Sequence, residues 1–196
     1  MRPRASPVLF LSAAIGAASA CIGVPAAEAK ADTPPRAHVE VAFSPAEDVA
    51  GLIVSRIAAA NASVLMQAYL LTDRRIANAL LAARKRGVEV ELIGDAAQQA
   101  SGGLPHLKAL VRAGVRVYLD SSHGAAHNKI VILDGEGAGA TVITGSYNFT
   151  RAAQRSNAEN VVVLSGNRAV TDRFVANFRR QRQSSTPWPS TSTSHR

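Results

Sequence analysis

Apolar and polar residues alternate along several short stretches of the chain. In residues 88–93, Val88, Val90 and Leu92 alternate with Glu89 and Glu91. Successive side chains of a β-strand point to opposite faces, so this pattern predicts a strand with one buried face. The run 130–133 is apolar throughout and predicts a fully buried strand. Similar stretches predict further strands at residues 38–43, 63–69, 115–119, 141–144 and 160–164.

Stretches with helical spacing lie between several of these strands. A helix opened by Pro45 and running to about Ala60 is predicted from apolar residues that share one face. These residues are Val49, Leu52, Ile53 and Ile57. Asp73 is a typical N-cap for a helix over 73–86, and Gly87 and Gly114 end the helices predicted at 73–86 and 104–113. The alternation predicts an α/β fold, a layered sandwich with a mixed, largely parallel β-sheet flanked by helices.

The N-terminal segment has the composition of a targeting sequence. Residues 1–29 combine the positive Arg2 and Arg4, an apolar run and the sequence Ala27-Glu28-Ala29, which is typical of a cleaved signal peptide. We therefore expect an exported protein, periplasmic or secreted. A retained membrane anchor is the alternative interpretation of the same segment.

The remaining boundaries follow from composition. Residues 30–37 predict a polar linker, and residues 38–183 predict the folded domain. Residues 184–196 are rich in Ser, Thr and Pro and predict a disordered tail, with Trp188 as a loose surface residue. The only cysteine, Cys21, lies in the predicted signal peptide. The mature chain is therefore expected to have neither a disulfide nor a thiol nucleophile.

The charge of the chain favours anionic partners. The formal net charge is +8 at pH 7, which suits nucleic acid or an acidic lipid surface. The alternative is that the protein is basic without a polyanionic partner, because net charge by itself describes solubility and association.

Residues suited to phosphoryl transfer gather around the predicted strands 130–133, 141–144 and 160–164. His127 and Lys129 precede the first strand, and in an extended chain their side chains point to the same face. Ser146 and Asn148 follow the second strand with the same spacing, and Glu159 precedes the third. A lysine neutralises phosphate charge, Ser and Asn donate hydrogen bonds to its oxygens, and a histidine can attack phosphorus or protonate the leaving oxygen. Gly145 is expected to let the backbone approach a ligand or turn sharply.

The sequence predicts no metal and no cofactor. It contains neither a Walker loop nor a pair of histidines at zinc-ligand spacing, and Asp134 alone is thin support for a metal site.

The motif His127-x-Lys129-x4-Asp134, followed by Gly145-Ser146-x-Asn148, resembles the HKD signature of the phospholipase D superfamily. The similarity is greatest to short bacterial periplasmic endonucleases of that superfamily. It extends over roughly Val39 to Arg182 and implies a phospholipase D-like catalytic domain at 38–183. Met66-Gln67-Ala68-Tyr69 and Asn157-x-Glu159 belong to the similar segments.

The resemblance implies a mechanism with two HKD motifs facing each other. One histidine forms a phosphohistidine and the other protonates the leaving group. This chain has one motif, so the resemblance implies a homodimer with His127 of each subunit at a shared site. It assigns phosphate binding to Lys129, Ser146 and Asn148, and orientation of the histidine to Glu159. Asp134 is counted with the catalytic set through its place in the motif, although a structural role is favoured.

Other residues are weaker candidates. Arg151 and Arg155 follow the Gly-Ser-x-Asn segment and are candidate nucleic-acid contacts, while His123 can reach substrate but is more simply a loop histidine. The glycine-rich loop 135–140 is longer than usual between the motifs and can alter access to the site.

The leading hypothesis for function is a metal-independent, low-specificity endonuclease that hydrolyses DNA. RNA is a further candidate substrate. The first alternative is a phospholipase D or phosphatidyltransferase, for which membrane lipid is the partner. The second is a non-catalytic nucleic-acid-binding module.

Overall fold

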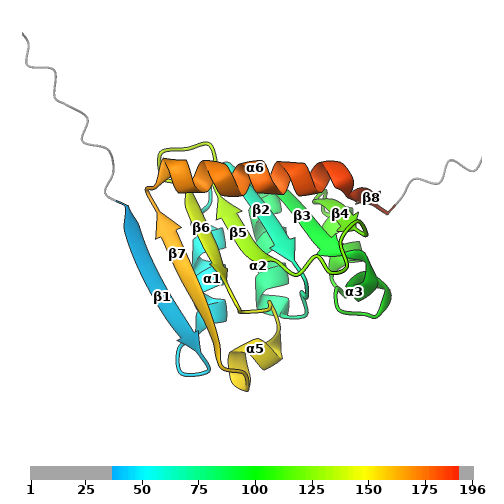
Figure 1. Ribbon diagram of the computed structural model, residues 1–196, viewed down its shortest axis with the longest axis horizontal. Helices are drawn as coiled ribbons and strands as arrows, with labels where there is room; N and C mark the ends of the chain where they lie inside the picture. Colours follow the sequence, from blue (N-terminus) through cyan, green and yellow to red (C-terminus); the bar gives the residue numbers. More distant parts are fainter. Residues whose placement is uncertain (1–36, 190–196) are drawn as a thin grey trace, which may run out of the picture. The chain divides into compact units, whose positions relative to one another are not determined.

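One sheet forms the centre of the fold. The computed structural model describes residues 37–189, in which an eight-stranded sheet has the order β1-β7-β6-β5-β2-β3-β4-β8 (Figure 1). The strands are β1 (His38–Ser44), β2 (Ser63–Ala68), β3 (Glu89–Asp95), β4 (Arg116–Asp120), β5 (Lys129–Leu133), β6 (Thr141–Gly145), β7 (Glu159–Ser165) and β8 (Thr186–Trp188).

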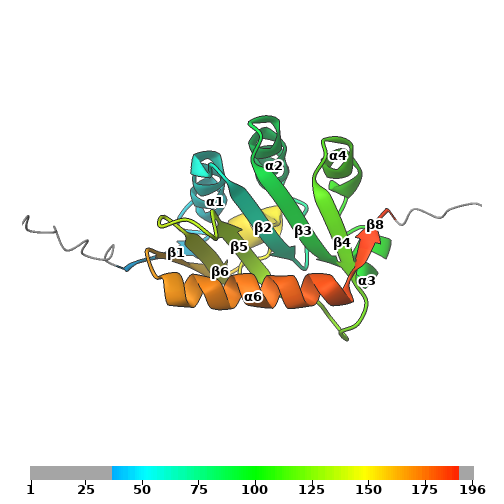
Figure 2. The ribbon, with the colours of Figure 1, turned by 90° about the horizontal axis from the view of Figure 1, so that it is seen from above.

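Helices cover both faces of this sheet. They are α1 (Val49–Ala59), α2 (Arg74–Lys85), α3 (Ala96–Ala100), α4 (Leu107–Arg112), α5 (Arg151–Arg155) and α6 (Arg168–Ser184). Figure 2 shows α1, α2 and α4 on one face and the long α6 across the other. The predicted α/β sandwich flanked by helices is confirmed.

The sheet is mixed, as predicted, but it is not largely parallel. Among the eight strands that the structure describes, the pairs β2–β3 and β3–β4 are parallel. The pairs β1–β7, β7–β6, β6–β5, β5–β2 and β4–β8 are antiparallel. Helices connect the parallel strands, whereas a loop without a helix joins β5 to β6 and lets the chain reverse. The expectation of a mostly parallel sheet was wrong for this reason.

Two apolar layers hold the helices to the sheet. The larger packs α1, α2 and α4 against one face and includes Ile53, Leu80 and Leu110. The smaller packs Val175 and Phe178 of α6 against the other face. Because strand residues alternate between faces, Val131 belongs to the larger layer and Ile130 to the smaller one.

The helix boundaries follow from their caps. Asp73 accepts a hydrogen bond from the backbone of Arg75, and Gly87 after α2 has φ +94°, so the predicted start and end of this helix are confirmed. The first helix begins at Val49 rather than at Pro45, because the carboxylate of Asp48 accepts from the Gly51 N–H and acts as the N-cap.

The C-terminal segment differs from its prediction. Residues 186–188 form β8, which pairs with β4, and Trp188 packs against the larger apolar layer. The expected disorder was therefore wrong for residues 184–189, since the end of α6 brings them beside an open strand edge. Residues 190–196, the predicted signal peptide at 1–29 and residues 30–36 of the predicted linker lie outside the described residues. In the described part of the chain, no helix is long and apolar enough to cross a membrane.

Candidate active site

His127 and Lys129 lie where the chain enters β5. The strand begins at Lys129, and His127 stands in the loop just before it. Their side chains meet, as the spacing predicts. The Lys129 ammonium donates to the His127 carbonyl oxygen at 2.7 Å and lies 2.9 Å from Nδ1 of the imidazole. A cation and an imidazole are thus presented together at one end of the strand.

A pocket of about 490 Å³ opens at this end of the sheet. The ends of β5, β6 and β7 contribute to it. We call it the His127 pocket, and its lining is His127, Asn128, Lys129, Thr144, Gly145, Ser146, Asn148 and Glu159. The structure therefore brings together His127, Lys129, Ser146, Asn148 and Glu159, as the strand ends predict.

Burial sets the electrostatics of Lys129. The residue is 7% exposed, and this desolvation lowers the pKa of its ammonium, while the charge of Glu159 partly offsets the effect. A partly desolvated cation attracts an anion more strongly than a hydrated one, because less water screens the interaction. Lys129 is therefore well placed to bind a phosphate oxygen in this pocket.

Tyr69 contacts both His127 and Lys129, although no role is predicted for it from the sequence. Its ring lies 4.4 Å from the His127 ring, centroid to centroid, and the Lys129 ammonium is 4.9 Å from its centroid. Gln98 donates to the Tyr69 hydroxyl at 2.9 Å. The only sequence signal for this residue is its place in the segment Met66-Gln67-Ala68-Tyr69, which follows β2 into the site.

Ser146 and Gly145 belong to the contact between β6 and β7. Ser146 Oγ accepts hydrogen bonds from the Asn160 N–H at 3.1 Å and from its side-chain amide at 3.4 Å. A Cβ on Gly145 would overlap the carbonyl oxygen of Asn160. The close approach of β7, rather than the expected approach to a ligand, therefore explains the glycine at position 145.

The amide of Asn148 has unused hydrogen-bonding capacity. Its Oδ1 atom is buried and has no partner among the described residues. The oxygen and nitrogen of such an amide are assigned from their surroundings, so either end can face the pocket. Buried polar groups rarely remain unpaired, and a ligand in the His127 pocket would supply the partner.

Glu159 faces the same pocket from β7. Its carboxylate accepts a hydrogen bond from the Asn157 amide at 3.0 Å and acts on Lys129 through its charge. Within residues 37–189 no hydrogen bond joins Glu159 to His127. The predicted orienting role therefore stays a prediction, and the described contact is with the lysine.

Asp134 lies at the opposite end of β5, roughly 20 Å along the extended chain from His127. Its carboxylate accepts the N–H groups of Asn61, Ala62 and Ser63 at 3.1, 2.7 and 3.0 Å. Burial raises the pKa of this carboxyl, and the three backbone donors more than offset that and lower it. Grouping Asp134 with the catalytic residues was wrong, because it holds the loop before β2.

The loop 135–140 also lies at that far end of the sheet, between β5 and β6. Glu136 in this loop pairs with Arg179 of α6. The loop therefore does not border the His127 pocket, and the expected influence on access is not supported within one chain.

Arg151 and Arg155 do not line the His127 pocket. They lie on α5 and line a separate hollow of about 600 Å³ together with Arg74, Arg75 and His106. Contact with nucleic acid stays a prediction for both. His123, by contrast, lines a second pocket that shares His127 with the first.

Comparison with known proteins identifies the family of this chain. A family model described as cardiolipin synthase, PLD-like domain, matches residues 53–182. The chain is also 36% identical over 143 residues to a phospholipase D of Rickettsia felis, covering 73% of this chain and 68% of that protein. The chain belongs to the phospholipase D superfamily. It is accordingly a phosphodiesterase of that superfamily, with the HKD residues His127 and Lys129 in the His127 pocket.

Two further relatives of this chain carry different names. A crystal structure of Nuc from Salmonella typhimurium, described as a phospholipase D family member, has a TM-score of 0.71 and 31% identity, covering 79% of this chain and 99% of that one. A mitochondrial cardiolipin hydrolase of Canis lupus familiaris is 28% identical over 163 residues, covering 83% of this chain and 61% of that protein. The superfamily is therefore established, whereas these names point to more than one substrate.

No group of three or more His, Cys, Asp or Glu side chains that could hold a metal ion occurs in the part of the chain that the structure describes. The predicted independence of metal remains a prediction that chelation tests.

Proposed function

We propose that this phospholipase D superfamily protein is a metal-independent, low-specificity endonuclease that hydrolyses DNA, with RNA as a second candidate substrate. The observation that carries the proposal is the gathering of His127, Lys129, Ser146 and Asn148 in one open, polar pocket. The net charge of +8 favours a polyanionic substrate. Contacts to phosphate alone carry no base specificity, so low sequence preference follows.

The chemistry proceeds in two displacements at phosphorus. A neutral nitrogen of His127 attacks the phosphodiester, a P–N bond forms, and the P–O bond to the leaving strand breaks. The leaving oxygen takes a proton from the partner subunit's His127. Water then gives a proton back to that second histidine and attacks the phosphohistidine, which forms a P–O bond and releases His127. Lys129 and Asn148 stabilise the charge on the phosphoryl oxygens in both steps.

A homodimer supplies the second histidine, since one chain contains a single HKD motif. An exposed apolar strip supports this part of the proposal. Val39, Val41 and Phe43 of β1 are each more than half exposed. They alternate with Ala42, which packs in the larger apolar layer, so they lie on the same face as α6, at the β1 edge where they stay exposed. Phe43 pairs in register with Asn160, the residue that bonds Ser146. A self-complementary contact over this strip would place the second copy beside the site.

Plasmid cleavage in excess EDTA tests the proposal. The full mature protein is compared with His127→Ala, and with Arg179→Ala as a control for charge on a helix outside the site. We expect wild-type cleavage that survives chelation and disappears only in His127→Ala. Loss of cleavage under EDTA would reject the metal-independent mechanism, and a His127→Ala protein with full activity would reject the assigned nucleophile.

Phospholipid is the second candidate substrate. The relatives named phospholipase D and mitochondrial cardiolipin hydrolase favour it, because the same phosphodiester chemistry would serve. Vesicles of phosphatidylcholine and of cardiolipin are incubated beside the plasmid under the same conditions. Release of choline or phosphatidic acid without DNA cleavage would replace the nuclease proposal with a lipid one.

A further inference from the structure

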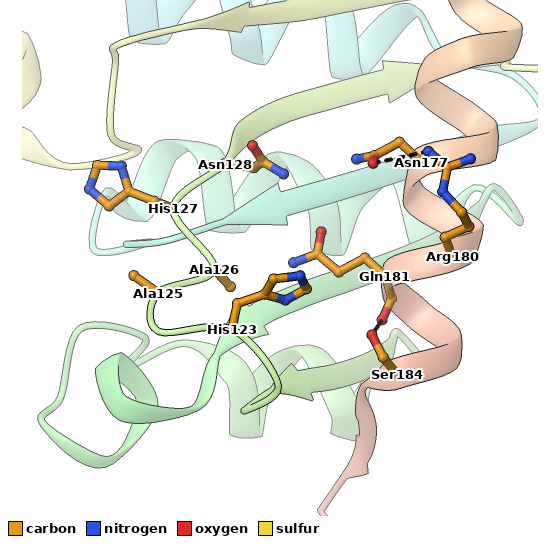
Figure 3. Close-up of a pocket in the computed structure, with 9 residues that line it drawn as sticks. All are labelled: His123, Ala125, Ala126, His127, Asn128, Asn177, Arg180, Gln181 and Ser184. Atoms are coloured by element: carbon orange, nitrogen blue, oxygen red, sulfur yellow. Dashed lines mark hydrogen bonds between the residues drawn. The ribbon is translucent and has the colours of Figure 1, made fainter.

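A second pocket of about 470 Å³ adjoins the His127 pocket (Figure 3). It lies between the chain segment that leads into β5 and the C-terminal half of α6, and it shares His127 and Asn128 with the first pocket. We call it the α6 pocket. The other residues that line it are His123, Ala125, Ala126, Asn177, Arg180, Gln181 and Ser184. The reaction assigned to the His127 pocket uses none of these.

A buried carboxylate shapes the α6 pocket. Asp120, at the end of β4, is 1% exposed. It accepts hydrogen bonds from the Gln181 amide at 2.8 Å, from Ser122 at 2.8 Å and from Nδ1 of His123 at 2.8 Å. Burial raises the pKa of this carboxyl, but hydrogen bonds from Gln181, Ser122 and His123 more than offset that and lower it to about 2. Asp120 is thus ionised near neutral pH and fixes one residue on each wall.

The contact with Asp120 determines which ring atom of His123 is available. An ionised carboxylate only accepts, so the bonded Nδ1 must carry a hydrogen. The other nitrogen, Nε2, is left to meet a ligand in the pocket, and in the imidazolium form of the ring it donates to a phosphate oxygen. The side chain of His123 is 59% exposed, so a ligand can reach it.

Arg180 provides positive charge from the α6 wall. Its guanidinium touches the Asn177 side chain at 3.4 Å, and it forms no ion pair with any described acidic residue. Arg179, the next residue on the helix, points elsewhere and pairs with Glu136. The unpaired arginine therefore faces the α6 pocket, and its neighbour serves as a natural comparison.

The positive lining continues beyond Arg180. A further hollow of about 500 Å³ shares Asn128, Asn177 and Arg180 with the α6 pocket and reaches Arg173. All three hollows share Asn128, and the two that include Arg180 lie along α6. Among residues 37–189 no acidic side chain lines the α6 pocket or the hollow that reaches Arg173, and the carboxylate of Asp120 lies buried behind His123 and Gln181. An anionic chain would therefore meet donors and cations along this route.

We propose that the α6 pocket binds a backbone phosphate of the nucleic-acid chain beyond the scissile one, through His123 and Arg180. This inference rests on the proposed function, because it assumes a substrate with more than one phosphate. His123 and His127 are separated by at most about 14 Å of fully extended chain. A strand of B-form duplex, with one phosphate per roughly 3.4 Å, spans this distance with at most about four nucleotides. A phospholipid headgroup with one phosphodiester would leave the α6 pocket empty.

Binding of a fluorescein-labelled, 12-nucleotide single-stranded DNA tests the inference. Fluorescence anisotropy is measured on the full mature protein with His127→Ala in the background, so that cleavage does not interfere. We expect His123→Ala and Arg180→Ala each to raise Kd by about tenfold, as loss of a charged hydrogen bond does. Each should also reduce the slope of log K against log salt concentration by about 0.7, the value for one phosphate contact on a single strand.

Arg179→Ala is the matched control, because it removes the same charge from the adjacent position of the same helix. An equal loss in Arg179→Ala, or unchanged affinity and salt slope in His123→Ala and Arg180→Ala, would overturn the subsite. Wild-type cleavage of DNA is measured separately. Cleavage with no effect of His123 or Arg180 on binding leaves the proposed function and removes this inference. Binding that depends on both residues, without DNA cleavage by the wild type, supports the phosphate site in the α6 pocket and contradicts the proposed nuclease function.

Discussion

The Lys129 ammonium lies 2.9 Å from Nδ1 of His127 in the wall of one pocket. The same ammonium lies 3.3 Å from Nε2, so Lys129 contacts both ring nitrogens of His127. A phosphate oxygen that enters the pocket would compete with the imidazole for this ammonium, because an ammonium donates its hydrogen bonds to whichever acceptors are near.

Lys129→Met should remove most of the activity while preserving the fold. The methionine keeps the length of the side chain but loses the charge that stabilises the phosphoryl oxygens. We expect kcat on bis(4-nitrophenyl) phosphate to fall by about 10² to 10³, the range for loss of one electrostatic contact in a transition state. Lys108→Met, which removes an exposed lysine of α4, is the control. Equal losses in both variants would mean that position 129 has no special role.

Glu159→Gln should shift the pH dependence of the reaction. Burial lowers the pKa of Lys129, and the charge of Glu159 raises it in part. Removing that charge lowers the Lys129 pKa further, so the ammonium is lost at a lower pH. The alkaline limb of the kcat/KM profile is therefore expected to move to lower pH. Glu136→Gln, at the far end of the sheet, should leave the profile in place; an alkaline shift in Glu159→Gln would exclude the assigned coupling.

Asp134→Ala should reduce stability rather than chemistry. Its carboxylate holds three backbone N–H groups, and losing them should lower the free energy of unfolding by about 2 kcal/mol. For a chain of this size, Tm should fall by about 4–8 °C. Folded protein should retain the wild-type kcat. A variant with normal Tm and no activity would restore Asp134 to the catalytic set.

The same carboxyl gives the stability difference a pH dependence. Its pKa is lowered in the folded state, so its contribution is present above the unfolded value of about 3.9 and is lost as pH falls through the folded one. Wild type and Asp134→Ala should therefore converge in Tm in acid. Asp172→Ala, which breaks an exposed ion pair with Arg168, should differ little from wild type throughout.

Gly145→Ala should disturb the contact between β6 and β7. The added Cβ would overlap the Asn160 carbonyl, and separating the strands should cost about 1–3 kcal/mol. Thermal unfolding measures this, with Gly139→Ala as the control, since a Cβ there meets nothing within 4 Å. An unaltered Tm in Gly145→Ala would show that the strands tolerate the methyl group.

Val41→Glu should dissociate the proposed homodimer. A charge in the centre of the exposed strip on β1 would be buried without a partner in the contact between subunits. Sedimentation should give a monomer, and activity should fall with the dimer because the second His127 is lost. Val41→Ile keeps the surface apolar and should remain dimeric. A fully active monomer of either protein would contradict the shared site.

Local pattern was sufficient to predict most elements and the residues that gather in the His127 pocket. The cap at Asp73 and the strand that begins beside Lys129 are set by neighbouring residues, so both could be predicted. Strand pairing depends on contacts distant in sequence, which explains the overestimate of parallel pairing. Asp134 matches the family motif, yet its partners Asn61 to Ser63 become visible only when β2 lies beside β5. Trp188 likewise gains its place only from β4.

The short strand β8 also protects one edge of the sheet from pairing with strands of other molecules. It covers the otherwise open side of β4. Its own outer side offers little to another strand, because Pro187 and the following Pro189 have no N–H to donate. The edge of the sheet at β8 is therefore a poor template for a strand from another molecule. Cutting the chain before Thr186 would uncover β4 and create a site for aggregation.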